Sequence, residues 1–203
     1  MRSLSEIETA AKRASRAVGF SWGDSEEVAK SIRQLELFGL QGIKNLNQYY
    51  KDKATKKFED LNLISKTNEA SLEAYCPIIL GISFLDQIKS IQDLKIIKFK
   101  KIAYPVLFLS FLSRASEISG KKIHIIFDKN EILLNLNVNI SSNFIDQEFP
   151  KIANTIEVNL LENKDNFNES DWNSLYKLAE DTFVEENESL KRGAAGAGLT
   201  DND

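Results

Sequence analysis

The segment Gly193–Asp203, which reads GAAGAGLTDND, is the first stretch whose residue types suggest chemistry. Glycine-rich loops can cradle phosphates, but a dinucleotide fingerprint needs a third glycine beyond Gly196 and Gly198, and a Walker loop needs a following Lys-Ser or Lys-Thr pair. Asp201 and Asp203 offer the oxygen ligands that Mg²⁺ and Ca²⁺ prefer, yet the glycine and distal glutamate of a calcium loop are missing. We therefore predict neither a cofactor nor a metal site.

Docking into a partner is the other use that this tail could have. Ordering its backbone costs on the order of 10–20 kcal/mol, and Leu199 is its one sizeable apolar side chain. Its composition therefore favours disorder, unless it threads a groove that satisfies its backbone and carboxylates. In that case we expect the contacts to come from Gly196, Gly198, Leu199, Thr200, Asp201, Asn202 and Asp203.

Cys76 and His124 are the only cysteine and the only histidine. Cys76 precedes Pro77 in an apolar context, where a free cysteine behaves as a small hydrophobic residue. A nucleophilic Cys76 would need a lowered pKa, and His124 is the sole histidine that could serve as its base. The pair Cys76–His124 is a testable alternative to two structural residues.

Two aromatic residues complete the candidate contacts. Trp22, followed by Gly23, is expected in the turn between the first two helices, where it either lines a ligand pocket or fills the gap between them. Tyr104 precedes Pro105 at the start of an apolar helix, and helix starts suit anions. Arg114 and Glu117 lie three residues apart on that helix and could pair with each other.

Charge and composition narrow the function classes. The net charge of −4 and pI near 5.3 give no general attraction to nucleic acid or to anionic membranes. A helix-turn-helix over residues 4–38 is disfavoured by this acidity and by the long expected connection FSWGDS, residues 20–25. The greasiest run, residues 102–112, is too short to span a membrane, and no secretory signal opens the chain. We expect a cytoplasmic protein.

The first 57 residues predict a helical layer. Apolar residues recur at helical spacing from Leu4 to Val18, a capping box is available at Ser3 or Ser5, and Gly19 supplies a stop. A second helix is expected to begin at Asp24 and to end at Gly39. A third, with Ile43, Leu46 and Tyr50 inward, leads to the lysine-rich residues 51–57.

Residues 58–190 predict a sheet with further helices. Residues 69–75 are expected as helix, residues 77–85 as a buried strand that periodicity cannot separate from helix, and residues 95–102 as an edge strand with lysines in water. The run 106–118, which follows Pro105, is apolar nearly all round and predicts a buried central helix that stops at Ser119-Gly120.

The most regular strand signal follows that helix. Residues 132–140 alternate apolar and asparagine residues, and residues 121–127 should pair with them as a hairpin across 128–130. Residues 156–160 predict a third antiparallel strand, and a last helix begins near Ser170 with Trp172, Leu175, Leu178 and Ala179 inward. The expected class is α+β: one domain over 1–190, made of a helical layer (1–57) and an antiparallel sheet with helices (58–190), and a tail over 191–203.

The opening LSEIETAAKRASRAVGFSWGDSEEVAKSI and the ending GAGLTDND resemble a family of uncharacterised bacterial proteins, known as a domain of unknown function. A looser correspondence runs through AYCPIILG and IAYPVLFLSFLSRAS, while the GAAGAG run and the lack of a proline after Phe183-Val184 depart from the family pattern. The resemblance supplies no activity. It implies that the tail takes part in the protein's work, together with Trp22, Gly23, Cys76, Pro77, Tyr104 and Pro105.

Two functions therefore remain open. The first is a non-catalytic accessory or assembly subunit whose tail docks into a protein partner or a neighbouring copy. The second is a small-molecule or metal-binding enzyme whose pocket the tail completes, beside Trp22, Tyr104 and Cys76. A homodimer through the N-terminal helices is a further possibility.

Overall fold

The computed structural model describes residues 2–127, 130–143 and 148–182 and divides the chain into two units, 1–163 and 164–203. The first unit contains five α-helices among its described residues: α1 (Leu4–Ala17), α2 (Trp22–Leu37), α3 (Gly42–Lys53), α4 (Pro77–Ile91) and α5 (Pro105–Ser119). A short 3₁₀ turn, η1 (Gln92–Leu94), follows α4. The second unit contributes α6 (Glu169–Glu180).

Six strands form one mixed sheet in the first unit, in the order β1-β2-β6-β3-β4-β5. Their bounds are β1 (Thr67–Glu69), β2 (Ile96–Ala103), β3 (Lys122–Phe127), β4 (Asn130–Asn135), β5 (Asn139–Ser142) and β6 (Ile152–Leu161). The β1–β2 pair is parallel and all the other pairs are antiparallel. Helices and sheet together confirm the α+β class, and the parallel pair corrects the expectation of a purely antiparallel sheet.

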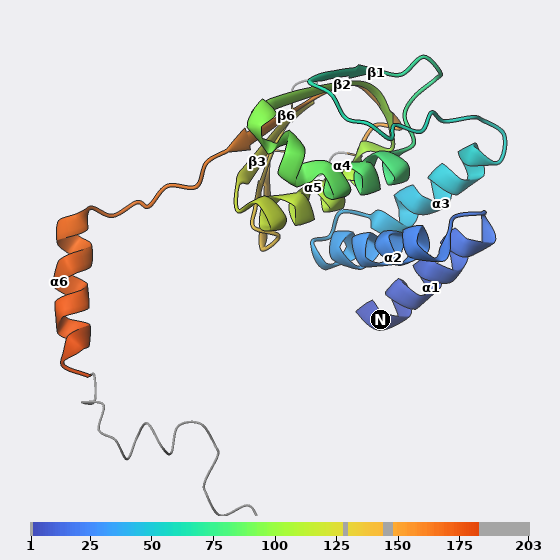
Figure 1. The fold of residues 1–203 in the computed structure, drawn as a ribbon. Coiled ribbons are helices and arrows are strands. Elements are labelled where there is room, and N and C mark those ends of the chain that lie inside the picture. The colour runs from blue at the N-terminus through green and yellow to red at the C-terminus, as the bar shows by residue number, and fades with distance from the viewer. Residues whose placement is uncertain (1, 128–129, 144–147, 183–203) are drawn as a thin grey trace, which may run out of the picture. The chain divides into compact units, whose positions relative to one another are not determined.

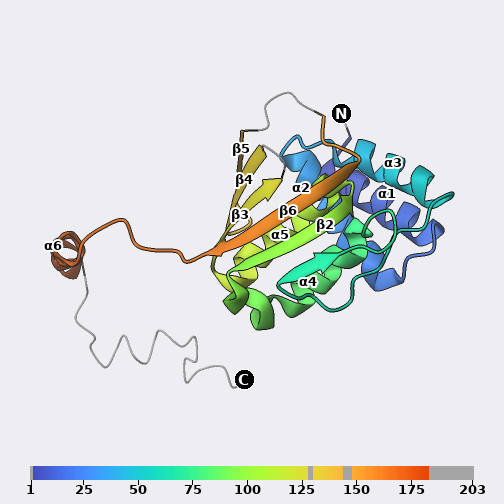
Figure 2. The same cartoon turned by 90° about the horizontal axis from the view of Figure 1, so that it is seen from above.

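The first unit is layered. In Figure 1, α4 and α5 lie against one face of the sheet, and α1, α2 and α3 lie on the far side of those two helices. Figure 2 shows β6 and β2 crossing the middle of the sheet above α5 and α4. Helix α5 carries eleven buried residues, so it is the central helix that its apolar sequence predicts. Its end at Gly120, with φ of 67°, is also as predicted.

The N-terminal caps decide where the first two helices begin. Ser3 and Glu6 form the expected capping box, since the Glu6 amide donates to Ser3 Oγ at 3.2 Å and the Ser3 amide donates to Glu6 Oε2 at 2.8 Å. The start predicted at Asp24 is wrong. Ser21 is the N-cap and forms a second capping box with Asp24, so Trp22 lies in the first turn of α2. The connection between α1 and α2 is therefore only residues 18–21.

Residues 77–85 are helix, not a buried strand. Cys76 caps α4, Pro77 occupies its first turn, and the helix continues to Ile91. Within the helix, Gly81 allows close packing on α5, because a Cβ atom there would lie 2.3 Å from Cδ2 of Phe111. The helix expected at residues 69–75 is also absent: β1 ends at Glu69 and a loop follows.

Two strand predictions also need correction. Strand β2 lies between β1 and β6, so it is not an edge strand, although Lys98 and Lys100 do face water as expected. The single strand expected over 132–140 is two strands, β4 and β5, because Leu136 and Asn137 adopt φ of 49° and 60° and reverse the chain. The hairpin of β3 with β4 and the third strand, β6, are confirmed.

In the second unit, helix α6 begins after its N-cap Asn168, whose side chain accepts from the Asp171 amide at 2.9 Å. No residue of α6 is buried. The expectation that Trp172, Leu175 and Leu178 point inward is wrong, because all three side chains are exposed.

Candidate functional site

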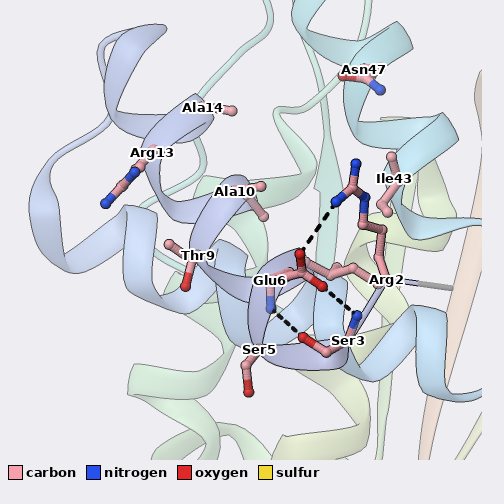
Figure 3. A pocket seen from close by; sticks show the side chains of 12 residues that line it. Arg2, Ser3, Ser5, Glu6, Thr9, Ala10, Arg13, Ala14, Ile43 and Asn47 are labelled. Atoms are coloured by element: carbon pink, nitrogen blue, oxygen red, sulfur yellow. Dashed lines mark hydrogen bonds and ion pairs between the residues drawn. The ribbon is translucent and has the colours of Figure 1, made fainter.

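A groove runs along α1 and reaches α3. It has a volume of about 790 Å³ and an apolar lining that includes Ala10, Ala14 and Ile43. Figure 3 shows these alanines on the side of α1 that faces Ile43 and Asn47 of α3. Small side chains of this kind let another backbone approach closely, so the groove is shaped for a peptide or a helix.

The acidic residue of this groove is already engaged. Glu6 accepts hydrogen bonds from Ser3 and Arg2, drawn as dashed lines in Figure 3. Its amide also donates to Ser3 Oγ, completing the capping box. The hydrogen bonds from the Ser3 backbone and side chain lower the pKa of Glu6. A carboxylate that is ionised and already accepts hydrogen bonds from two residues is a poor general acid or base at neutral pH. The groove is therefore better suited to binding than to catalysis.

Trp22 does not fill the gap between the first two helices. Its side chain is 61% exposed and lies beneath the cationic groups of Lys12 and Arg16, which are 5.8 and 5.3 Å from the ring centroid. It lines a second open cavity, of about 680 Å³, between α1 and α2. Cation–π contacts at exposed sites are worth about 0.5–1 kcal/mol.

The basic residues of α1 and α2 are largely paired with carboxylates. Lys12 contacts Glu26 at 2.5 Å, Lys30 contacts Glu27 at 2.8 Å and Arg33 contacts Glu8 at 3.6 Å. The short connection removes one of the two arguments against a helix-turn-helix, but these pairs reduce the positive charge that phosphate binding requires. The absence of a nucleic-acid partner remains a prediction.

Cys76 lies in a buried cluster of hydrogen-bonded side chains. It is only 3% exposed, and its Sγ is 2.9 Å from Oη of Tyr49. Burial raises the pKa of the Cys76 thiol and that of the Tyr49 hydroxyl. A buried neutral thiol is a poor nucleophile, so the geometry favours the structural interpretation of Cys76.

Tyr104 belongs to the same cluster. Its ring meets that of Tyr49 edge-on at 5.8 Å, and its hydroxyl donates to Asp52 Oδ2 at 2.8 Å. Burial, followed by the bond to Asp52, raises the pKa of Tyr104. Its backbone is left-handed, with φ of 43°, which is uncommon for an aromatic residue, and its amide donates to the Lys151 carbonyl at 2.7 Å. We call Tyr49, Cys76, Tyr104 and Asp52 the tyrosine cluster.

The structure thus brings Cys76 and Tyr104, two predicted site residues, together through Tyr49, which the sequence pattern did not single out. The buried face of α3 contains Leu46 and Tyr49, whereas Ile43 is exposed and the Tyr50 hydroxyl bonds Ser15 Oγ at 2.6 Å. The predicted inward face of this helix included Tyr50, one residue away from Tyr49, and Tyr49 was therefore missed. The three-residue spacing from Leu46 to Tyr49 was the signal that could have revealed it.

His124 lies apart from Cys76. It sits on the face of β3 opposite to the buried Ile123 and Ile125, and its Nε2 is 3.2 Å from Glu131 Oε2 on β4. Cys76 instead caps α4, which packs on the other face of the sheet. The structure therefore does not support a Cys76–His124 catalytic pair.

The predicted pair between Arg114 and Glu117 is wrong. Arg114 reaches across to α2 and bonds Glu27, while Glu117 accepts from Asn137 Nδ2 at 3.0 Å. Helix α5 packs directly against α2, and these contacts join it to α2 on one side and to the β4–β5 turn on the other. The charged residues of this apolar helix therefore connect elements and do not line a cavity.

The predicted tail contacts, Gly196 to Asp203, lie outside the described residues. Across 2–127, 130–143 and 148–182, no group of three or more His, Cys, Asp or Glu side chains could hold a metal ion. In the same ranges no helix has both the length and the apolar character needed to cross a membrane.

Comparison with curated proteins and with solved structures gave no match. A comparison with protein families did. Residues 2–75, which hold α1 to α3 and the loop through β1, match a family described as "Protein of unknown function (DUF3726)". The expected resemblance to an uncharacterised family is thereby confirmed over this part of the chain, and over these residues the protein is similar to DUF3726.

Proposed function

We propose that this protein is an accessory or assembly subunit that binds a protein partner, or a second copy of itself, through its C-terminal segment. The proposal is carried by the exposed apolar face of α6 in the second unit. We call the exposed apolar side chains of this helix, together with the residue shortly before it, the α6 stripe; its members are Trp172, Leu175, Tyr176 and Leu178 of α6 and the preceding Phe167.

The stripe is large for a surface helix. Trp172 is 46% exposed and Leu175 is 62% exposed. The rings of Phe167 and Trp172 stack at 5.6 Å, and those of Trp172 and Tyr176 are 6.1 Å apart. Leu175 and Tyr176 follow Trp172 at the three- and four-residue spacing that places side chains on one helix face.

Such a face is typical of a helix that binds in a groove. Tryptophan and tyrosine are the side chains that most often dominate binding energy, and apolar residues at i, i+3 and i+4 are the anchors of helix-in-groove recognition. Acidic residues flank the stripe at both ends: Glu169 and Asp171 in the first turn, and Glu180 and Asp181 at the last. The partner that fits best has an apolar groove with a basic rim.

The tail that follows α6 belongs to the same proposal. Residues 193–203 supply small residues and carboxylates but little apolar surface. The α6 stripe would provide the apolar anchor that the tail lacks, and the tail would extend the contact.

The test replaces the stripe in the full chain. The double variant Trp172→Ser/Leu175→Ser is compared with Leu63→Ser, a 78% exposed leucine in a loop of the first unit. Sedimentation measures self-association, and affinity capture from the source cells measures binding of partner proteins. We expect the double variant to lose association by at least about tenfold, or about 1.4 kcal/mol, and the Leu63 variant to retain it.

A deletion of residues 196–203 separates the tail from the helix. We expect it to weaken association less than the loss of the stripe does, because apolar anchors contribute most of the binding energy. If the stripe variant and the deletion both associate like the unaltered chain, the proposal is wrong.

A further inference from the structure

A third cavity lies where α2 and α4 begin and α3 ends. It has a volume of about 440 Å³, and Ser21, Lys53, Lys57, Phe58 and Cys76 are among the residues that line it. Its walls come from three segments that are distant in the sequence, residues 19–24, 53–60 and 72–79. The fold therefore assembles this cavity, which no single local motif predicts.

The lining of the cavity contains one more basic than acidic side chain, although the whole protein is acidic. Three lysines, Lys53, Lys56 and Lys57, border it, against the two carboxylates Asp24 and Asp60. Lys56 is paired with Glu73 at 2.7 Å. In the part of the chain that the structure describes, Lys53 and Lys57 form no ion pair, and Lys53 lies 5.3 Å above the ring of Phe20.

Of the two carboxylates, Asp24 accepts from the Ser21 amide at 3.3 Å in the capping box of α2, and Asp60 lies in the lining without an ion pair to any described residue. Two ammonium groups without carboxylate partners at the mouth of one cavity attract an anion and repel each other in its absence.

The wall beside the lysines is apolar. Phe20 lines it from the α1–α2 connection and Ile79 from α4, and Phe58 and Leu72 line it from the loops. Phe20 is buried and Phe58 is half-buried, so the rings are held in place. An inorganic ion would use the lysines alone, whereas an anion with an apolar body would use both parts of the lining.

We infer that this cavity binds a small organic anion, in which a phosphate or carboxylate group contacts Lys53 and Lys57 and an apolar body lies against Phe20 and Phe58. The inference is independent of docking through the α6 stripe.

The experiment titrates the full-length protein with phenyl phosphate, benzoate and inorganic phosphate and follows backbone amide shifts by NMR. We expect shifts centred on residues 19–24, 53–60 and 76–79. Because the apolar wall binds only the ring, phenyl phosphate should bind several-fold to about tenfold more tightly than inorganic phosphate. Tighter binding of phenyl phosphate than of benzoate identifies a phosphate ligand, and the reverse order identifies a carboxylate; both support the site.

Matched lysine variants distinguish the cavity from general attraction of anions. Lys53→Gln/Lys57→Gln should weaken phenyl phosphate binding about tenfold or more. Lys66→Gln/Lys89→Gln removes the same charge from two exposed lysines away from the cavity and should leave binding unchanged. Unchanged dispersion of the remaining amide signals shows that each variant is folded.

Three results would overturn the inference. They are equal weakening by both double variants, shifts scattered over the lysines of the sheet, and equal binding of phenyl phosphate and inorganic phosphate.

Discussion

Two of the places where aromatic rings meet in the described residues have similar ring spacing but opposite exposure. In the tyrosine cluster, Tyr49 and Tyr104 meet at 5.8 Å, and Tyr49 and Phe58 meet at 5.4 Å. In the α6 stripe, Phe167 and Trp172 meet at 5.6 Å. Tyr49 is fully buried, whereas Trp172 is nearly half exposed. Ring contact alone therefore does not distinguish a core from a surface.

Burial decides what each group of rings contributes. Rings inside the first unit exclude water from all sides, and their hydroxyls are bonded to Cys76 and Asp52. Burial of these rings already contributes to the free energy of folding, because burying apolar area stabilises by about 25 cal/mol per Å². The side chains of the α6 stripe keep about half of their area in water, and the free energy of burying that area is gained only when something covers it. The first group stabilises, and the second is suited to bind.

The largest effect is expected from Tyr49→Ala. Removal of a fully buried aromatic ring leaves a cavity, and such changes lower the free energy of unfolding by about 3–5 kcal/mol. Urea denaturation followed by far-UV circular dichroism measures the change. Tyr49→Phe, which keeps the ring and removes the bond to Cys76, should cost only about 1 kcal/mol. If Tyr49→Ala lowers the free energy of unfolding by less than about 1 kcal/mol more than Tyr49→Phe does, the cluster is not a packed core.

Gly81→Ala should have the second largest effect. Its new Cβ atom would lie 2.3 Å from Cδ2 of Phe111, so α4 and α5 would have to move apart beneath the sheet. Overpacking of this kind costs about 1–3 kcal/mol, although alanine is the better helix former. Gly23→Ala is the matched control, because its Cβ would meet only Ser21 Oγ, at 3.8 Å. Equal stability of the two variants would mean that α4 and α5 are not tightly packed.

The N-terminal helices could be predicted because their local signals agree. The Ser3–Glu6 capping box, the apolar spacing from Leu4 and the stop at Gly19 all indicate one helix. For α2, a second capping box at Ser21 and Asp24 competed with the pattern that begins at Asp24. The pattern Asp24-x-x-Glu27 looked equally good, and only the backbone shows which residue is the cap.

Helix α4 could not be predicted for a physical reason. Residues 77–85 are apolar on every side, because α4 packs against both the sheet and α5, and a run without polar positions has no period. The β4–β5 turn was missed for the opposite reason, because the sequence pattern around it is regular. The alternation of residues 132–140 continues through Leu136 and Asn137, although both adopt left-handed backbone geometry, which asparagine tolerates but leucine rarely adopts.

The tyrosine cluster shows how much of the candidate site could be predicted from the sequence. Cys76 and Tyr104 could be chosen from their neighbouring prolines, but their meeting depends on how α3 packs against the starts of α4 and α5. The cavity beside Cys76 likewise needs three distant segments. Local patterns specify elements, whereas sites made by packing several elements are specified only by the tertiary contacts.

A smaller effect is expected from the ion pair that joins α2 to α5, which tests whether charge matters as much as packing in the first unit. Burial opposes ionisation of Glu27, but the hydrogen bonds from Lys30 and Arg114 outweigh it, so the pKa of Glu27 lies below its ordinary value of 4.5. A lowered folded-state pKa gives stability that is present above pH 4.5 and is lost as the pH falls through the folded-state value.

Glu27→Gln should therefore lower the free energy of unfolding by about 1 kcal/mol or less at pH 7. The difference from the unaltered chain should shrink below pH 4.5. Urea denaturation at pH 7 and near pH 3.5 gives both values. Glu69→Gln, which breaks the exposed pair with Lys100, is the control and should change stability less. A Glu27 difference that grows toward low pH would contradict the assigned direction.

The smallest effect on the free energy of unfolding is expected from Trp172→Ala, which should have the largest effect on association. Trp172→Ala removes the ring that stacks on Phe167, but the ring is nearly half in water and α6 has no buried residue. Substitutions of exposed side chains usually change the free energy of unfolding by less than about 0.5 kcal/mol. Urea denaturation beside Tyr49→Ala should therefore show almost no shift of the midpoint, while association through the α6 stripe is lost. If Trp172→Ala destabilised the chain as strongly as Tyr49→Ala, the stripe would be part of a core, and the contrast between stabilising and binding rings would fail.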